Sequence, residues 1–335
     1  MEGAERSEER LDGMADKQLI GALAAGDRVD SYFSVAYRKP VSEYRYGHMF
    51  EFRVADRTGQ VTAKYWGGDD RARVESLHDS LSKGDVVRIV GEVSEFKSQL
   101  EISISEKNGG IVEHLSDGDY DISGLLKTLD GIQEMKDRLL VFARSVEEPH
   151  VSMLLKSFFE HDEFMEAFSA CPASIQLHSA AVGGLLHHTL NVVEMCTKVL
   201  QLQPNLDRDL VIAGALLHDI GKVRSFAVGT NINHTPEGNL IGHLTIGDEE
   251  LAARIRTIEG FPEDLAMKLR HIVLAHHGRK EWGSPVEPMT PEALLVHHAD
   301  DLDAKLDYMV ARRDEAVTED DWTWDRRLSR LIYLR

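Results

Sequence analysis

The hydrophobic pattern changes its period part-way along this chain, and that change limits the folds open to it. Up to about residue 105, apolar and polar residues alternate through SYFSVAYRKPVS, HMFEFRVADRTGQVTAKYW and DVVRIVGEVSEFKSQLEISIS. Such alternation predicts half-buried β-strands. From about Gly131 onward, apolar residues recur every three or four positions, which predicts amphipathic helices. The chain should therefore combine a β domain with an all-α domain.

The alternating segment has room for about five short strands. ADRTGQVTA reads as a hairpin with Gly59 at its tip. A small barrel fits this spacing, with an SH3-like barrel or an open sheet as the alternatives. We divide the chain into a polar N-terminal arm (1–28), a β-barrel (29–105), a Gly- and Asp-rich linker (106–130) and a helical domain (131–335).

Composition narrows the function classes. The chain has 335 residues and a formal net charge of −19, which disfavours non-specific nucleic-acid binding by the whole surface but allows a local basic groove. The start, MEGAERSEERLDG, lacks the features of a signal peptide, and no apolar run is long enough to cross a membrane. Only Cys171 and Cys196 are present. These features predict a cytoplasmic protein with reduced thiols and no membrane partner.

Histidine and aspartate residues gather in the helical half. The segment ALLHDIGKV places His218 and Asp219 at the end of an apolar helix, where such groups must be paired, hydrogen-bonded or bound to a metal. Helices packed around one core can direct ligands to one point. Imidazole and carboxylate together suit Zn, Fe, Mn or Ni, and two ions can assist a phosphoryl displacement. The clusters are His187–His188, His218–Asp219, His243, His276–His277, His297–His298 and Asp300–Asp301.

The motifs LHHT, LLHDIGKV, GHLTIG, LAHHG and HHADDLDAK resemble the HD-domain superfamily of metal-dependent phosphohydrolases. The longer runs TPEGNLIGHLTIG and AHHGRKEWGSPVEPMTPEALLVHHADDLDAK resemble its YhaM-type branch, 3′–5′ exoribonucleases with an OB-fold ahead of the HD domain. The resemblance covers roughly residues 30 to 312. It implies a multi-domain α and β fold, in which an N-terminal OB-like β-barrel precedes an all-α HD-domain helical bundle.

The resemblance also implies roles for single residues. His188, His218, Asp219 and Asp300 match a first metal site, and His243, His276 and His277 match a second, with Asp219 bridging. Two divalent ions are implied, Mn²⁺ first, with Mg²⁺, Co²⁺, Fe²⁺ or Zn²⁺ as alternatives. Lys222 matches a lysine near the substrate phosphate; its other reading is a surface salt bridge. The sequence leaves His187 open against His188, and Asp301 open against Asp300.

The β segment alternates aromatic and basic residues, as OB-folds that bind single strands do. Bases stack on such rings, and cations follow the backbone. About half of the rings must instead face the barrel core, because a strand shows every second side chain to one face. The candidate nucleic-acid-binding residues are Trp66, Lys64, Tyr37, Arg38, Arg53 and Phe50.

Together with these features, the resemblance implies a metal-dependent 3′–5′ exoribonuclease that hydrolyses single-stranded RNA to nucleoside 5′-monophosphates, with Asp219 and Lys222 as catalytic residues; the 3′–5′ polarity is implied by the resemblance alone. Single-stranded DNA stays open as a substrate, because no reader of the 2′-hydroxyl is recognised. The alternatives are a phosphohydrolase of dNTPs or signalling nucleotides with a regulatory OB domain, and a non-enzymatic nucleic-acid-binding protein with a structural metal. The sequence leaves the oligomeric state open, including a homo-oligomer.

Overall fold

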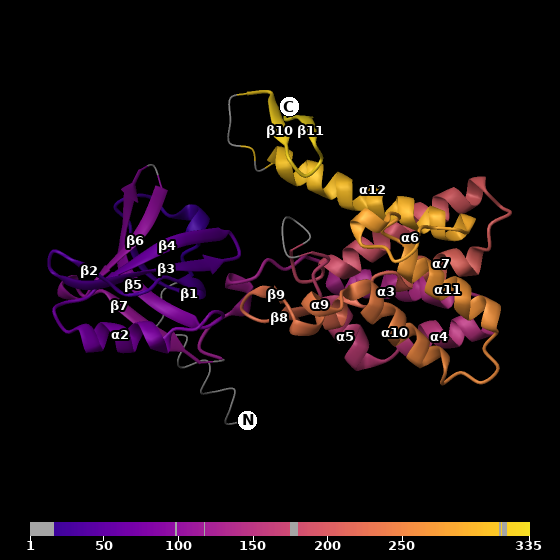
Figure 1. Ribbon diagram of the computed structural model, residues 1–335, viewed down its shortest axis with the longest axis horizontal. Helices are drawn as coiled ribbons and strands as arrows, with labels where there is room; N and C mark the ends of the chain where they lie inside the picture. Colours follow the sequence, from indigo (N-terminus) through magenta and orange to yellow (C-terminus); the bar gives the residue numbers. More distant parts are fainter. Residues whose placement is uncertain (1–16, 98, 117, 175–179, 315, 317–319) are drawn as a thin grey trace. The chain divides into compact units, whose positions relative to one another are not determined.

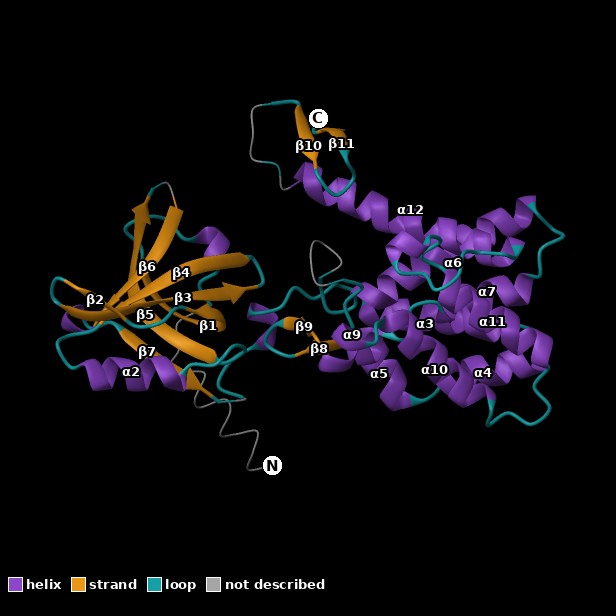
Figure 2. Ribbon diagram, viewed as in Figure 1, coloured by secondary structure: helices purple, strands orange, loops and turns teal. Residues whose placement is uncertain are grey.

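The computed structural model describes residues 17–335 except for 98, 117, 175–179, 315 and 317–319 (Figure 1). It divides into two compact units. The first runs to Lys127 and includes Gly229–Asn231; the second comprises Thr128–Val228 and Ile232–Arg335. Strands dominate the first unit and helices the second (Figure 2). The predicted fold class, an OB-like barrel followed by a helical HD domain, is confirmed.

The first unit is a five-stranded barrel with additional edge elements. The barrel order is β1-β3-β4-β6-β5, and pairing of β1 with β5 closes it, which excludes an open sheet. The β4–β6 pair is parallel and the other barrel pairs are antiparallel. The elements are β1 (Arg28–Arg38), β2 (Ser42–Tyr44), β3 (Gly47–Asp56), β4 (Gly59–Trp66), α2 (Arg71–Ser80), β5 (Val86–Phe96), β6 (Gln99–Ser105) and β7 (Ile111–Leu115).

The segment 106–130, predicted as a linker, differs from that expectation. It contains β7, which pairs antiparallel with β5 and adds a strand to the edge of the sheet. The compact unit extends to Lys127. The polar composition of this segment suits an edge strand with little burial, which is why it read as a linker. Residues 1–16 of the predicted arm (1–28) lie outside the described residues. Further along the arm, the backbone N–H groups of Gln18 and Ile20 donate hydrogen bonds to Ser31 and Asp56 of the barrel, respectively.

The second unit packs its helices around one apolar core. Within the described ranges, no helix is long and apolar enough to span a membrane. Its elements are α3 (Ile132–Arg144), α4 (Pro149–Phe159), α5 (Asp162–Ala170), α6 (Gly184–Leu202), α7 (Arg208–Leu217), α8 (Lys222–Ser225), β8 (Phe226–Val228), β9 (Ile232–His234), α9 (Pro236–Leu240), α10 (His243–Ile255), α11 (Glu263–Ala275), α12 (Pro291–Asp314), β10 (Trp322–Asp325) and β11 (Arg330–Tyr333).

Candidate metal centre and nucleic-acid-binding face

Two helices, α7 and α11, are each followed by a histidine that turns back onto its own helix. Nδ1 of His218 lies 2.7 Å from the carbonyl oxygen of Ala215, and Nδ1 of His276 lies 2.7 Å from that of Val273. A carbonyl oxygen can only accept, so Nδ1 carries the hydrogen in both rings. The bond satisfies a carbonyl of the last turn, which has no donor within the helix. Each Nε2 keeps its lone pair, which can ligate a metal.

The turn after α7 brings a third helix close to the same point. A Cβ on Gly221 would lie 2.0 Å from the carbonyl oxygen of His243, so only glycine allows this approach of α8 to α10. The first residue of α10, His243, then has Nε2 3.4 Å from Oδ1 of Asp219. The glycine of the HDIG motif therefore serves close packing beside the candidate site.

The structure brings His188, His218 and Asp300 together from α6, α7 and α12, with one donor atom of each within 4.8 Å of the others. Nε2 of His188 lies 3.2 Å from Nε2 of His218 and 3.2 Å from Oδ1 of Asp300. Two ligands about 2.1 Å from a shared ion are about 3.0–3.4 Å apart at the usual bond angles. These two spacings fit one bound cation, and the third, between Nε2 of His218 and Oδ1 of Asp300, is wider at 4.0 Å.

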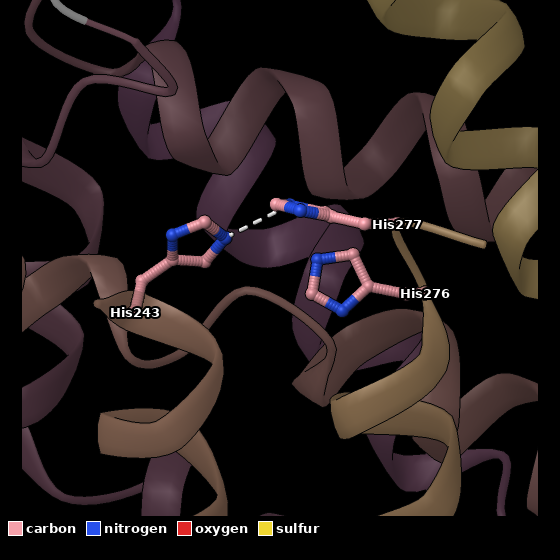
Figure 3. A group of neighbouring side chains, drawn as sticks. All are labelled: His243, His276 and His277. Carbon is pink, nitrogen blue, oxygen red and sulfur yellow. Dashed lines mark hydrogen bonds between the residues drawn. The ribbon is translucent and has the colours of Figure 1, made fainter. Parts of the chain in front are cut away.

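A second group consists of His243, His276 and His277, whose donor atoms also lie within 4.8 Å of one another. The three rings converge, and Nε2 of His243 is 3.2 Å from Nε2 of His277 (Figure 3). His277 is oriented from behind, with Nδ1 2.9 Å from the carbonyl oxygen of Trp282. Burial lowers the pKa of His243 and that of His277, which favours the neutral imidazole that binds metals.

Asp219 lies between the two groups and turns one oxygen to each. Oδ2 is 3.3 Å from Nε2 of His218, whereas Oδ1 is 3.5 Å from Nε2 of His276. The residue is 1 % exposed, and among the described residues neither oxygen accepts a hydrogen bond of normal geometry. A buried carboxylate needs compensation: the ammonium of Lys222 supplies it at Oδ2, and a bound cation on each side would add to it. The residues present therefore fit a metal centre in which Asp219 lies between two ligand groups.

His188 is held between two carboxylates. Its Nε2 faces Asp300, and its Nδ1 lies 2.6 Å from Oδ2 of Asp303. Burial alone would lower the pKa of His188, but the hydrogen bonds with Asp300 and Asp303 raise it to about 9. The space beside Nε2 thus favours positive charge. A metal ion can take the place of that proton when it binds.

Lys222 lies inside the site, 14 % exposed, with its ammonium nitrogen 2.5 Å from Oδ2 of Asp219. Burial alone would raise the pKa of Asp219, but Lys222 and His218 hold it well below its usual range. Burial likewise disfavours charge on Lys222, and the nearby Asp219 and Asp300 raise its pKa above its ordinary value. Both groups are charged at neutral pH. The alternative of a surface salt bridge does not describe this buried pair.

The structure distinguishes the two members of each pair that the sequence left open, His187 or His188 and Asp300 or Asp301. His187 is exposed, whereas His188 is buried in the site. Asp301 forms an ion pair with Lys305 at 2.6 Å, while Asp300 faces His188. Sequence reasoning missed Asp303, which orients His188 and also accepts a hydrogen bond from Asn191. Its position three residues after Asp300, on the same helix face, was the available signal.

The candidate centre opens into a pocket of about 680 Å³. The candidate ligands His188, His243, His277 and Asp300 line it, together with Lys222. His297, from a cluster noted in the sequence, also lines the pocket, and its Nδ1 lies 2.7 Å from the carbonyl oxygen of His276. The pocket can admit a phosphate-bearing group beside the ligands. Its lining residues are Ala173, Ser174, His188, Lys222, Phe226, His234, His243, His277, Trp282, His297, Asp300, Asp301, Ala304, Asp307, Tyr308 and Arg327.

Four of the six candidate nucleic-acid-binding residues share the outer face of β1, β3 and β4. Tyr37 pairs with Arg53, Arg53 pairs with Thr62, and Thr62 is on the same side of β4 as Lys64 and Trp66. Tyr37 is 58 % exposed. Lys64 forms an ion pair with Glu101 at 2.6 Å. In OB-folds this second-and-third-strand face binds oligonucleotides.

Trp66 is partly exposed on this face, and its ring contacts Tyr44 and Ser103. Its ring centroid lies 5.0 Å from that of Tyr44 at an interplanar angle of 64°, and its indole nitrogen donates to Ser103. The remaining two candidates lie elsewhere. Phe50 has no exposed surface and packs in the barrel core, so it cannot present its ring to a base. Arg38 is directed at α2, where it contacts the carbonyl oxygen of His78 and lies 3.5 Å from Asp79.

Comparison with known proteins gives the class of this chain. Residues 37–108 match the OB-fold nucleic acid binding domain, and residues 185–305 match the HD domain. HD domains are metal-dependent phosphohydrolases, which agrees with the converging histidine and aspartate ligands. The chain is thus an HD-domain protein with an OB-fold module ahead of its candidate metal centre.

Its relatives narrow the class to one family. The 3′-5′ exoribonuclease YhaM of Geobacillus sp. is 30 % identical over 80 % of this chain and 79 % of the relative. The 3′-5′ exoribonuclease YhaM of Bacillus velezensis and that of Bacillus subtilis are each 28 % identical over 89 % of this chain and 91 % of the relative. The chain belongs to the family of the 3′-5′ exoribonuclease YhaM.

Proposed function

We propose that this protein is a metal-dependent 3′–5′ exoribonuclease that releases nucleoside 5′-monophosphates from single-stranded RNA. One observation carries the proposal: both oxygens of the buried Asp219 face histidine groups that can hold a metal, His218 on one side and His276 on the other. Membership of the YhaM family and the OB-fold module support RNA as the substrate. Cys171 and Cys196 form no disulfide, which supports action in the cytoplasm.

The chain supplies two ligand sets for this chemistry. His188, His218 and Asp300 would hold one ion, and His243, His276 and His277 the other, with Asp219 shared between them. Bound divalent ions, Mn²⁺ first among the candidates, supply Lewis-acid chemistry at a phosphodiester. The histidines whose Nδ1 is already hydrogen-bonded present Nε2 in fixed orientations.

Lys222 contributes positive charge inside the pocket. Its ammonium lies against Asp219 and lines the cavity that would receive the substrate. With a metal ion held at Asp219, the Lys222 ammonium would be available to a non-bridging phosphate oxygen of the substrate. There it would stabilise the negative charge that develops during hydrolysis. Asp219 and Lys222 are therefore the proposed catalytic residues.

The substrate class is tested with a panel. Metal-loaded protein is incubated with single-stranded RNA, single-stranded DNA of the same sequence, and dNTPs, and the products are separated by chromatography. We expect hydrolysis of RNA to nucleoside 5′-monophosphates. Hydrolysis of dNTPs with RNA left intact would instead indicate a nucleotide phosphohydrolase. Equal cleavage of both polymers would extend the substrate class to DNA.

The barrel face makes a separate prediction. We propose that Trp66 stacks on a base of a long RNA, while Tyr37, Arg53 and Lys64 contact adjoining nucleotides of the same RNA. Stacking contributes about 1–3 kcal/mol per base. We therefore expect Trp66→Ala to weaken long-RNA binding by about 5- to 150-fold. Binding is measured by fluorescence anisotropy, and cleavage of a dinucleotide should be unchanged.

Folding must be checked in the same variant, because Trp66 also contacts Tyr44 and Ser103. Phe50→Leu is the matched control: it alters the barrel core without removing a ring from the proposed face. Loss of RNA affinity in Trp66→Ala, at a melting temperature no lower than that of Phe50→Leu, supports stacking. Equal slowing of dinucleotide and long RNA would show that Trp66 serves the fold.

A further inference from the structure

Besides histidines, the pocket beside the candidate metal centre has three aromatic residues in its lining, Phe226, Trp282 and Tyr308, and they differ in exposure. The ring of Phe226 packs against His234, with centroids 5.0 Å apart. Tyr308 hydrogen-bonds to Asp325, and the guanidinium of Arg327 lies 4.9 Å from its ring centroid. Both residues are partly buried, whereas Trp282 is 47 % exposed. Of these three rings, Trp282 is the most exposed.

The backbone around Trp282 is held in place. The residue ends a short 3₁₀ turn, Lys280–Trp282, between two glycines with left-handed backbone, Gly278 at φ +81° and Gly283 at φ +95°. A Cβ on Gly278 would lie 2.1 Å from the ring of His297. Backbone hydrogen bonds from Trp282 and Ser284 to Arg279, and from Gly283 to Lys280, close this turn beside the candidate ligands.

The same residue is tied directly to a candidate metal ligand. Its carbonyl oxygen accepts a hydrogen bond from Nδ1 of His277 at 2.9 Å. The backbone of Trp282 thus orients a ligand while its side chain lines the pocket. These two roles can be separated by substitution, because removing the indole leaves the carbonyl oxygen in place.

Two cations lie over the indole ring. The guanidinium of Arg279 is 5.1 Å from the ring centroid, and the ammonium of Lys305, which also pairs with Asp301 at 2.6 Å, is 5.4 Å from it. An exposed aromatic ring with cations beside it is the combination that binds single-stranded nucleic acid, since the ring stacks on a base and the cations face phosphates. Neither stacking on the indole nor contact with the phosphate depends on the identity of the base.

We propose that Trp282 forms a nucleobase-stacking subsite for the 3′-terminal nucleotide of the RNA, with Arg279 and Lys305 facing its phosphate backbone. The proposal rests on the proposed exoribonuclease function. The subsite positions the terminal nucleotide against the metal centre without selecting a base. Trp282 is a positioning residue, because it contacts the base and not the scissile bond.

The test compares two substrates that differ only at the 3′ end. One RNA carries an ordinary 3′-terminal nucleotide, and the other carries an abasic one. Initial rates are measured with the full-length Mn²⁺-loaded protein and with Trp282→Ala, Trp282→Phe and Trp322→Ala. Trp322 is the matched control, because it is 56 % exposed and does not line the pocket.

We expect the wild-type protein to prefer the base-bearing end by about 5- to 150-fold in kcat/KM. Trp282→Ala should lose that preference by slowing only on the base-bearing RNA. Trp282→Phe should keep most of it, and Trp322→Ala all of it. Equal rates of the wild-type protein on both RNAs, or equal slowing of Trp282→Ala on both, would overturn the subsite.

A binding measurement separates the subsite from the proposed function. Calorimetry compares the affinities of AMP and ribose 5-phosphate for the wild-type protein and for Trp282→Ala. We expect AMP to bind more tightly, by a margin that the substitution removes. If RNA is not cleaved but AMP still binds more tightly than ribose 5-phosphate through Trp282, the proposed function fails and the subsite stands. If RNA is cleaved and the margin is absent, the subsite fails alone.

Discussion

Asp219→Asn is expected to abolish RNA hydrolysis, with a loss of at least about 10³-fold in turnover. Asparagine keeps the shape of the side chain but loses the negative charge that both ligand groups share. Asp219 is 1 % exposed and faces His218 through one oxygen and His276 through the other. The variant should therefore also bind less metal, which elemental analysis of purified protein measures.

The control is Asp264→Asn, because Asp264 is exposed at the start of α11 and pairs only with Lys268 among the described residues. It should keep its activity and its metal content. Circular dichroism should show that both variants retain the helical fold. Full activity in Asp219→Asn, or full metal content without activity, would contradict a bridging role for this carboxylate.

Lys222→Met is expected to lower the single-turnover rate by about 10- to 1000-fold while RNA binding stays unchanged. The substitution keeps the length of the side chain and removes the charge that would face the phosphate in the transition state. Lys222 is paired with the buried Asp219, so the metal-free variant should melt at a lower temperature than the metal-free wild type. Bound metal should reduce this difference, because it compensates Asp219.

Lys198→Met removes an exposed lysine from α6 and provides the control. Its rates and melting temperature should match those of the wild type. A Lys222→Met variant with weaker RNA binding and normal turnover would make the lysine a docking group. Loss of metal from that variant would give Lys222 a structural role in assembling the ligands.

The sequence was most informative where local pattern and chemistry agree. An apolar helix that ends on His218 and Asp219 requires compensation for both groups, and the structure brings them beside two histidine groups. The choice between Asp300 and Asp301 was different. The two residues lie on opposite flanks of the apolar stripe of α12, and only the packing of that helix against α6 sets Asp300 beside His188.

Residues that act through a neighbour were hardest to predict. Asp303 carries no motif of its own, and its contact joins α12 to a residue 115 positions earlier in the chain. Trp282 lies in a short turn, where no periodicity predicts the direction of a side chain. Its place in the pocket depends on how the turn after α11 is held.

Strand alternation alone predicts which of the candidate nucleic-acid-binding residues on β3 face the barrel core and which face outward. Phe50 has the parity of Phe52 and Val54 on β3, and all three face the core. Arg53 has the opposite parity and faces outward. The sequence does not give the pairing of β3 with β4, which puts Arg53 and Trp66 on one face. Strand β7 was missed because its polar, Gly-flanked segment resembles a loop.

The most direct measurement is product sizing with a single-stranded RNA that carries its label at the 5′ end. Metal-loaded protein is added, and samples are separated over time on a denaturing gel. A 3′–5′ exoribonuclease shortens the labelled RNA one nucleotide at a time and releases unlabelled nucleoside 5′-monophosphates. We predict this ladder, and its absence in Asp219→Asn. Immediate release of labelled mononucleotide, or RNA that stays intact with metal bound, would contradict the proposed function.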